Sequence, residues 1–294
     1  MKTSKILVLT LLSVLTFSCS KNETETPKFS SDETAVNAKI DLMNEDVSSI
    51  VEGLETDTYT NASNFTSENN TPSLSKITTC GTISRDPAFG TPLTPGTVVT
   101  KTIDFGTDGC ALANGNTVKG KIVVTFTYQP SATTHTITYT FTDFYHNAIK
   151  YNGSDIFTRE MSVGTQTSPS HPIVTMNINM AATLADGRVL NRVGERVREI
   201  MEGYGTAGLE DNVYQVTGSW TTTYPNSTVL SSSITSPLII KMSCLDVHKP
   251  LLVQGVITHT RNGRVSTLNY GEGICDNLAV LTINGIAYNI VIGN

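Results

Sequence analysis

A two-residue period of apolar side chains runs through most of this chain and restricts it to extended structure. Apolar and mostly polar residues alternate in the segments 121–128, 135–144, 173–184 and 213–224. Successive side chains of a strand point to opposite faces of a sheet, so this period is typical of strands that bury one face. Charged residues make up only 16% of the chain, and the many threonines, serines and asparagines suit strands whose other face meets water.

Turn dipeptides separate these strands. They are Asn114-Gly115, Asn152-Gly153, Asp186-Gly187, Asn262-Gly263 and Asn284-Gly285. Both central residues of a type I′ turn need a positive φ, which Asn-Gly and Asp-Gly tolerate best. No helical pattern lies between the strands to allow parallel crossovers. We therefore predict a mainly β fold, an antiparallel meander of hairpins with roughly a dozen strands that forms a curled sheet, a sandwich or an open barrel.

One segment, 33–54, has a helical period instead. Its apolar residues recur at steps of three and four, and they are Val36, Ile40, Met43, Val47, Ile50, Val51 and Leu54. This spacing predicts an amphipathic N-terminal helix with one apolar stripe. We expect the stripe to pack on the sheet of its own domain, and a helix that binds a partner is the alternative.

The first 18 residues have the features of a secretory signal peptide. Two lysines precede a mostly apolar run at 6–17, which is too short to span a bilayer, and Cys19 follows at the expected cleavage point. The polar segment that begins at Cys19 cannot bury enough surface to order itself, so 19–32 is predicted to be a flexible tether. The remainder, 33–294, is predicted to be a single β-rich domain that begins with the helix.

Four further cysteines fall into an internal repeat. Cys80 precedes Cys110 by 30 residues, and Cys244 precedes Cys275 by 31. The second cysteine of each pair follows an apolar, Asp/Asn, aromatic, Gly sequence, which is Ile103-Asp104-Phe105-Gly106 in one copy and Leu268-Asn269-Tyr270-Gly271 in the other. Because an exported chain meets an oxidising compartment, we predict disulfides within each copy, Cys80–Cys110 and Cys244–Cys275. A cross-link between the two copies and four free thiols are the alternatives.

The sequence resembles a family of Bacteroidota surface lipoproteins of the flavobacterial type that has no assigned activity. Leu15-Thr16-Phe17-Ser18-Cys19 resembles a lipobox, and the partly acidic segment after Cys19 resembles a surface-export signal. The segments 103–110, 184–188, 268–277 and 282–285 resemble parts of the family pattern. The resemblance implies a lipid on Cys19 and an outer-membrane location, facing the cell surface or, alternatively, the periplasm.

No catalytic or metal-binding motif is evident. No two histidines have a metal-binding spacing, and Gly-x-Ser-x-Gly and His-Glu-x-x-His are absent. The glycine-rich segment 203–208 lacks the Lys-Ser/Thr of a phosphate-binding loop and is predicted to be a flexible connection. Oxygen-bearing residues that could hold Ca²⁺ are better explained by tight turns, and they are Asp104, Asp108, Asp276 and Asn277. We therefore predict no catalytic residue, no metal and no cofactor.

Half of the eight arginines lie within eleven residues, at Arg188, Arg192, Arg196 and Arg198. All four have even numbers, so in an unbroken strand they share one face, opposite Val193. Two interpretations remain open. The face could bind an anion such as an acidic glycan or a lipopolysaccharide phosphate, or it could be a solvated face with cross-strand ion pairs.

These observations favour a non-enzymatic surface protein. The modest net charge of −6 speaks against a nucleic-acid partner. We expect a binding or structural module that is attached to the membrane through Cys19 and contacts a glycan or another surface protein. A surface hydrolase acting on glycans is the alternative, and a cleft with two carboxylates at catalytic separation would distinguish it.

Overall fold

The computed structural model describes residues 29–60, 77–78, 80–165, 169–206 and 208–293. Cys19 and the predicted signal peptide lie outside the described residues. The elements are α1 (Ser31–Thr60), β1 (Thr82–Asp86), β2 (Val98–Asp104), β3 (Cys110–Ala111), β4 (Thr117–Thr127), β5 (Thr134–His146), β6 (Ile149–Met161), β7 (Pro172–Thr183), β8 (Val189–Glu202), β9 (Val213–Thr223), β10 (Val229–Lys241), the 3₁₀ helix η1 (Met242–Val247), β11 (Leu252–Arg261), β12 (Arg264–Glu272), β13 (Leu278–Ile283) and β14 (Ile286–Val291).

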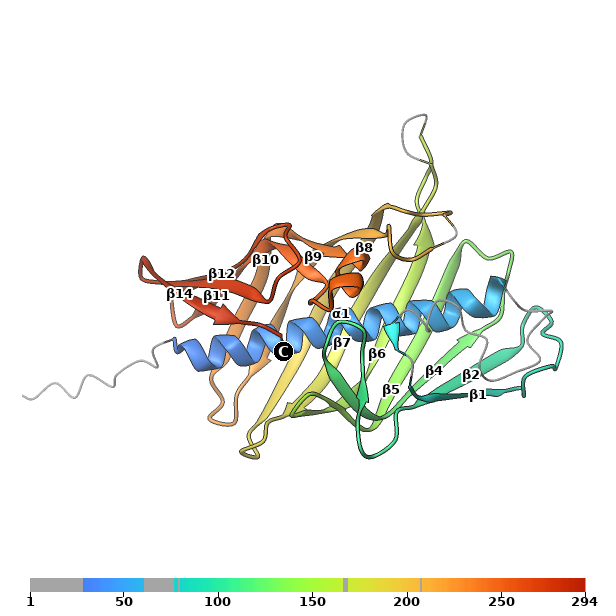
Figure 1. Cartoon of the computed structure of the whole chain (residues 1–294), viewed down its shortest axis with the longest axis horizontal. Helices are drawn as coiled ribbons and strands as arrows, with labels where there is room; N and C mark the ends of the chain where they lie inside the picture. Colours follow the sequence, from blue (N-terminus) through green and yellow to red (C-terminus); the bar gives the residue numbers. More distant parts are fainter. Residues whose placement is uncertain (1–28, 61–76, 79, 166–168, 207, 294) are drawn as a thin grey trace, which may run out of the picture.

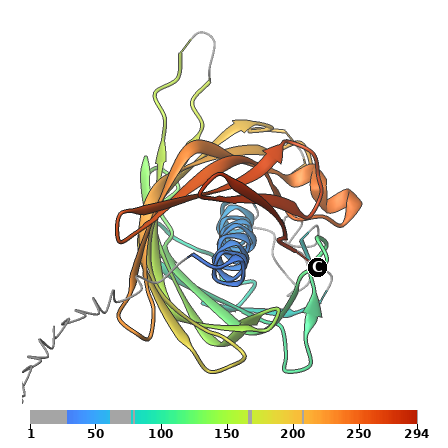
Figure 2. The ribbon, with the colours of Figure 1, turned by 90° about the vertical axis from the view of Figure 1, so that its left-hand side faces the viewer.

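The strands form one antiparallel sheet of 14 strands that follows the chain order, except that the short β3 pairs only with β4. The sheet curls around the helix, as the end-on view in Figure 2 shows. The first and last strands, β1 and β14, do not pair with each other, so the described sheet remains open. The predicted fold class is confirmed, and of the three predicted arrangements the chain adopts the curled, unclosed sheet.

The helix α1 lies along the inside of this curl (Figures 1 and 2). Every residue from Ile40 to Val51 is buried, whatever its polarity. The predicted apolar stripe packs in the core of the domain, and Ile40, Met43 and Ile50 have no exposed surface. The sheet therefore encloses the polar face of the helix as well, which one-sided packing on a sheet does not do.

The helix is longer than the predicted 33–54 at both ends. It begins at Ser31, within the predicted tether, and the Ser30 side chain caps it by accepting a hydrogen bond from the Glu33 amide at 3.0 Å. It continues beyond Gly53 because the enclosing sheet buries the next turn as well. The Leu54 carbonyl, for example, accepts a hydrogen bond of 2.7 Å from the buried Lys101 ammonium.

The last two Asn-Gly dipeptides form the predicted hairpin turns. Asn262 and Gly263 have φ angles of 49° and 74°, and Asn284 and Gly285 have φ angles of 51° and 80°. The dipeptides therefore join β11 to β12 and β13 to β14 with the positive φ values that a type I′ turn needs.

The prediction of a turn at Asn152-Gly153 is wrong. Both residues lie inside β6, and the turn between β5 and β6 is formed by residues 147–148. Gly153 has φ of 139°, and a Cβ at this position would lie 2.4 Å from the Asn179 carbonyl oxygen. The glycine is needed there because the backbone of β7 approaches β6 too closely for any side chain.

The structure contains both disulfides that the repeat predicts, Cys80–Cys110 and Cys244–Cys275. In each copy the repeat places the second cysteine close to the glycine that ends a strand: Gly106 follows β2 and Gly271 lies at the end of β12. The first disulfide attaches the segment before β1 to β3, and the second attaches η1 to the loop after β12. The first therefore fastens irregular chain to the sheet, and the second joins two irregular segments to each other.

Candidate functional site

Three of the four clustered arginines point into the sheet, toward the helix. Arg192, Arg196 and Arg198 are at most 3% exposed, whereas Val193 on the opposite face of β8 is 56% exposed. The polarity of this strand is thus reversed relative to an ordinary half-buried strand, with charge inside and valine outside. The physical reason is the helix opposite, which presents carboxylates rather than apolar side chains to β8.

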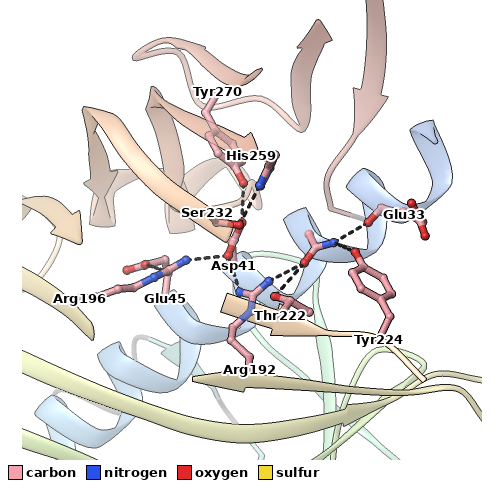
Figure 3. Close-up of polar contacts among 11 residues, drawn as sticks. Glu33, Asp41, Glu45, Arg192, Arg196, Thr222, Tyr224, Ser232, His259 and Tyr270 are labelled. Carbon is pink, nitrogen blue, oxygen red and sulfur yellow. Dashed lines mark hydrogen bonds and ion pairs between the residues drawn. The ribbon is translucent and has the colours of Figure 1, made fainter. Parts of the chain in front are cut away.

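Asp41 of α1 is the centre of this contact (Figure 3). Its Oδ1 accepts hydrogen bonds of 2.6 Å from both Arg192 and Arg196, and its Oδ2 accepts one of 3.1 Å from the Tyr270 hydroxyl. Arg196 also donates to Glu45, one helical turn further on, at 2.9 Å. Charge-assisted bonds of this kind compensate for removing both partners from water.

The rest of the arginine cluster has different partners. Arg198 donates to the Ser49 hydroxyl at 3.2 Å and lies 3.5 Å from a Glu52 carboxylate oxygen. Arg188 lies outside the curl and pairs with Asp186 at 2.7 Å. The four arginines therefore form neither an exposed anion-binding strip nor a solvated face with cross-strand ion pairs, because three of them are buried against carboxylates of α1 and the fourth pairs with Asp186 in a turn.

A signal for this network is present in the helix sequence. The polar face of 33–54 carries short side chains such as Asn37, Asp41 and Asn44, and Lys39 is its only lysine. A solvated helix face usually carries long Lys and Glu side chains that pair with one another. A face of Asp, Asn and Ser opposite an arginine-rich strand indicates an internal contact instead.

A second buried contact pairs His146 of β5 with a carboxylate of α1. His146 Nε2 lies 2.7 Å from Asp46 Oδ2 of α1, and Asn114 and Asn116 also donate to the Asp46 carboxylate, at 2.7 and 2.9 Å. Asp143, the acidic residue nearest to His146 in the sequence, is exposed and pairs with Lys150. This cluster fixes the middle of α1 to β5 and to the loop between β3 and β4, and both oxygens of Asp46 are engaged by partners from the same chain.

The candidate functional site is a cavity of about 580 Å³ at the C-terminal half of α1. Its wall is formed at one end of the central strands, where β5, β7 and β9 begin and β6 and β8 end. The cavity exists because α1 presents small residues there, namely Ser49, Gly53 and Thr56. These are spaced i, i+4 and i+7 and so share one helix face, which is a signal that the sequence offers and apolar periodicity overlooks.

The glycine-rich segment 203–208 belongs to this cavity. Gly203, Tyr204, Gly205, Thr206 and Gly208 all line it. The segment lies in the connection between β8 and β9, at the end of these strands, and the prediction that it is a connection is confirmed. The prediction gave it no further role, whereas the structure makes it part of the wall.

The rest of the wall is largely apolar. The apolar side chains are contributed by Met161, Pro172, Val174, Ile200, Leu209 and Met242. The ionisable side chains that border the space are Glu52, Arg159, His135 and Arg198, with the tyrosines Tyr59, Tyr204 and Tyr214. A mostly apolar space with a few polar groups is typical of small-molecule sites.

Two ionic contacts border the cavity. Glu55 is fully buried, and its carboxylate lies 2.9 Å from Arg159 Nη1 and 3.5 Å from His135 Nδ1. The nearby Glu55 carboxylate raises the pKa of His135 above its usual value. Burial raises the pKa of Glu52, against the opposing effect of the Arg198 guanidinium.

No group of three or more His, Cys, Asp and Glu side chains is arranged to hold a metal ion in the described part of the chain. Asp104 instead accepts hydrogen bonds from the Gly106 amide and Lys121, and Asp276 accepts one from the Leu278 amide. These contacts agree with the interpretation of both residues as parts of tight turns. Of the helices formed by the described residues, none has the length and apolar character needed to cross a bilayer.

Replacing Arg196 with Ala is expected to lower the free energy of unfolding by about 3–5 kcal/mol, because Glu45 and Asp41 each lose a buried cationic partner. Denaturant unfolding followed by circular dichroism measures the change. The matched control is Arg188→Ala, which removes an exposed pair and should change the free energy by less than about 1 kcal/mol. Equal effects of the two substitutions would contradict the assignment of the network.

Asp155 gives a pH-dependent prediction. Its side chain has no exposed surface, and burial raises its pKa to about 6, although Oδ1 accepts a hydrogen bond from the Asn179 amide. A raised carboxyl pKa means that the folded state holds the proton more tightly, so this group makes the fold less stable as the pH rises from about 4 to about 6.

Asp155→Asn keeps the oxygen acceptor and removes the buried charge. It should therefore raise the free energy of unfolding at pH 8, by on the order of 2–3 kcal/mol, and flatten its pH dependence between about pH 4 and 6. Urea unfolding at a series of pH values measures both effects. Asp143→Asn, at an exposed position, is the control and should not produce the gain. A variant that is less stable than the unmodified protein at pH 8 would refute the prediction.

Comparison of the chain with models of protein families, with curated proteins and with solved structures found no match.

Proposed function

We propose that this protein is a binding module, attached by a lipid on Cys19 to the outer membrane and facing the cell exterior, which holds a small molecule in the cavity beside α1. The cavity is the observation that carries the proposal. Its volume of about 580 Å³ falls within the range of roughly 300–1,000 Å³ that is usual for small-molecule sites.

The buried network supports binding by keeping the cavity open. Asp41 and Glu45 fix the first half of α1 to β8, and Asp46 fixes its middle to β5 and to the loop between β3 and β4. The second half is fixed by Glu55, which pairs with Arg159 of β6. Because these contacts keep the helix from moving toward the sheet and filling the cavity, a ligand would bind without the free-energy cost of separating the helix from the sheet.

The alternative, a hydrolase acting on glycans, needs two carboxylates that flank the substrate. Among the described residues that line the cavity, Glu52 is the only acidic one. The neighbouring Glu55 is fully buried and already contacts Arg159 and His135. The described wall therefore favours binding over glycoside hydrolysis.

The direction of α1 relates the anchor to the cavity. The helix begins near one end of the domain (Figure 1). The residues of α1 that line the cavity lie in the C-terminal half of the helix. A helix of 30 residues is about 45 Å long. With a lipid on Cys19, the end of the domain at Ser31 would lie nearest the attachment point, and the mouth of the cavity would be remote from it.

The cavity can be tested with the neutral fluorescent probe N-phenyl-1-naphthylamine. We expect the probe to gain fluorescence with the unmodified protein and to lose most of the gain with Ile200→Trp, because the larger side chain fills the space. Met201→Trp is the matched control, since the next residue of β8 points outward and is 53% exposed. A probe that does not bind the unmodified protein, or binds both variants equally, would refute the proposed site.

The anchor is tested separately in bacteria that lipidate exported proteins. Cys19→Ala removes the thiol that would carry the lipid, so the protein is expected to lose labelling by an alkyne-modified fatty acid and to leave the membrane fraction. Cys80→Ala with Cys110→Ala is the control, because these cysteines are joined in a disulfide and should not affect labelling. Labelling of the Cys19→Ala variant at the unmodified level would refute lipidation at this residue.

A further inference from the structure

We propose that the ligand of the cavity is an amphiphile with a carboxylate end, that Arg159 binds this carboxylate beside His135, and that the apolar wall takes the rest of the molecule. This inference rests on the proposed binding function and names the class of ligand.

The two cationic residues form a pair on the inner face of the sheet. His135 of β5 and Arg159 of β6 are directly opposite each other in the strand register. Directly opposite residues have neighbouring side chains on the same face of an antiparallel sheet. Both residues border the cavity, so they form one continuous patch on its wall.

These two residues are accessible, unlike the arginines of the buried network. The side chains of Arg159 and His135 are 21% and 16% exposed, whereas those of Arg192 and Arg196 are 1% exposed. A ligand in the cavity can thus reach this pair without displacing any part of the network.

The charges at this pair are not balanced. Arg159 and His135 contact the same carboxylate, Glu55, which is fully buried behind them. When His135 is protonated, two cations face one anion, and the excess positive charge lies toward the cavity. The bond to Glu55 uses Nη1 of Arg159, and a guanidinium has five N–H donors in a planar fork that matches a carboxylate.

The orientation of His135 is fixed by the protein. Its Nε2 lies 2.8 Å from the Ala132 carbonyl oxygen, and its Nδ1 lies 2.9 Å from the Tyr59 hydroxyl. The Nε2 nitrogen therefore carries a proton, and protonation occurs at Nδ1, beside Glu55. The ring supplies charge to the patch while Arg159 supplies the donors.

The remaining ionisable groups of the wall do not cancel this excess. Glu52 lies 3.5 Å from Arg198, and this pair contributes no net charge. Burial raises the pKa of the Tyr59 and Tyr214 hydroxyls, so these two side chains add no negative charge at pH 7. With His135 protonated, the cavity offers one cationic patch within a largely apolar wall, which suits a molecule with one anionic end and an apolar body.

Isothermal titration calorimetry at pH 7 with dodecanoate, dodecan-1-ol and dodecylammonium, each below its micelle concentration, tests the class of ligand. The three probes share an apolar chain and differ in the charge of the polar end. We expect dodecanoate to bind about tenfold more tightly than the alcohol, because of its charge-assisted hydrogen bonds, and the ammonium to bind most weakly. Dodecanoate that binds no more tightly than the alcohol would overturn the inference.

Variants assign the preference to the patch. Arg159→Gln should reduce the preference for dodecanoate over the alcohol to less than about threefold, and Arg159→Lys should retain part of it, since lysine keeps the charge but not the fork. Arg188→Gln, at an exposed position outside the cavity, should retain all of it. An unchanged preference in folded Arg159→Gln, or a preference lost equally in Arg188→Gln, would refute the role of Arg159.

The neutral probe N-phenyl-1-naphthylamine separates this inference from the proposed function. Arg159→Gln should still bind the probe, because the apolar wall is intact, whereas Ile200→Trp should not. If the unmodified protein binds the probe but shows no preference for the carboxylate, the inference fails and the binding function stands. If it does not bind the probe, the proposed function itself fails.

Discussion

The contact between Asp41 of the helix and the arginines of β8 is the constraint on which the rest of the structure depends. The guanidinium groups of Arg192 and Arg196 both contact Oδ1 of Asp41, on the inner side of the sheet. The other terminal nitrogen of Arg196 pairs with Glu45. Taking these charges out of water is costly, and an apolar contact of the same size would often be as stable. The ion pairs are directional, however, and they fix both the rotation of α1 and its position along the strands.

This directionality accounts for an unusual core. Among the described strands, β1 and β14 are the two edges of the sheet, which encloses a helix that is buried on its polar side as well as its apolar side. An apolar helix in this position could slide or rotate at little cost. Asp41, Asp46 and Glu55 each bind a different part of the sheet, so the helix has one position along its whole length.

The cavity follows from the same arrangement. Where α1 carries Asp41 and Glu45, long arginine side chains from β8 fill the space between helix and sheet. Where α1 carries Ser49, Gly53 and Thr56, its side chains are too small to fill the space between helix and sheet, and the sheet cannot move closer because the helix is fixed to it on both sides of the cavity. A space of this kind in a tightly packed interior is usually destabilising. Its presence beside accessible cationic side chains is the reason for regarding it as a site.

The sequence by itself determined the strands, the two type I′ hairpins, the helix and both disulfides, because each depends on local periodicity, turn chemistry or a repeat. It did not determine which face of β8 points inward, since alternation gives two faces without saying which is inside. The environment of Arg192 and Arg196 was decided by a helix about 150 residues away in the chain. The turn assigned to Asn152-Gly153 and the cavity were likewise decided by tertiary structure, because both depend on how closely neighbouring segments approach.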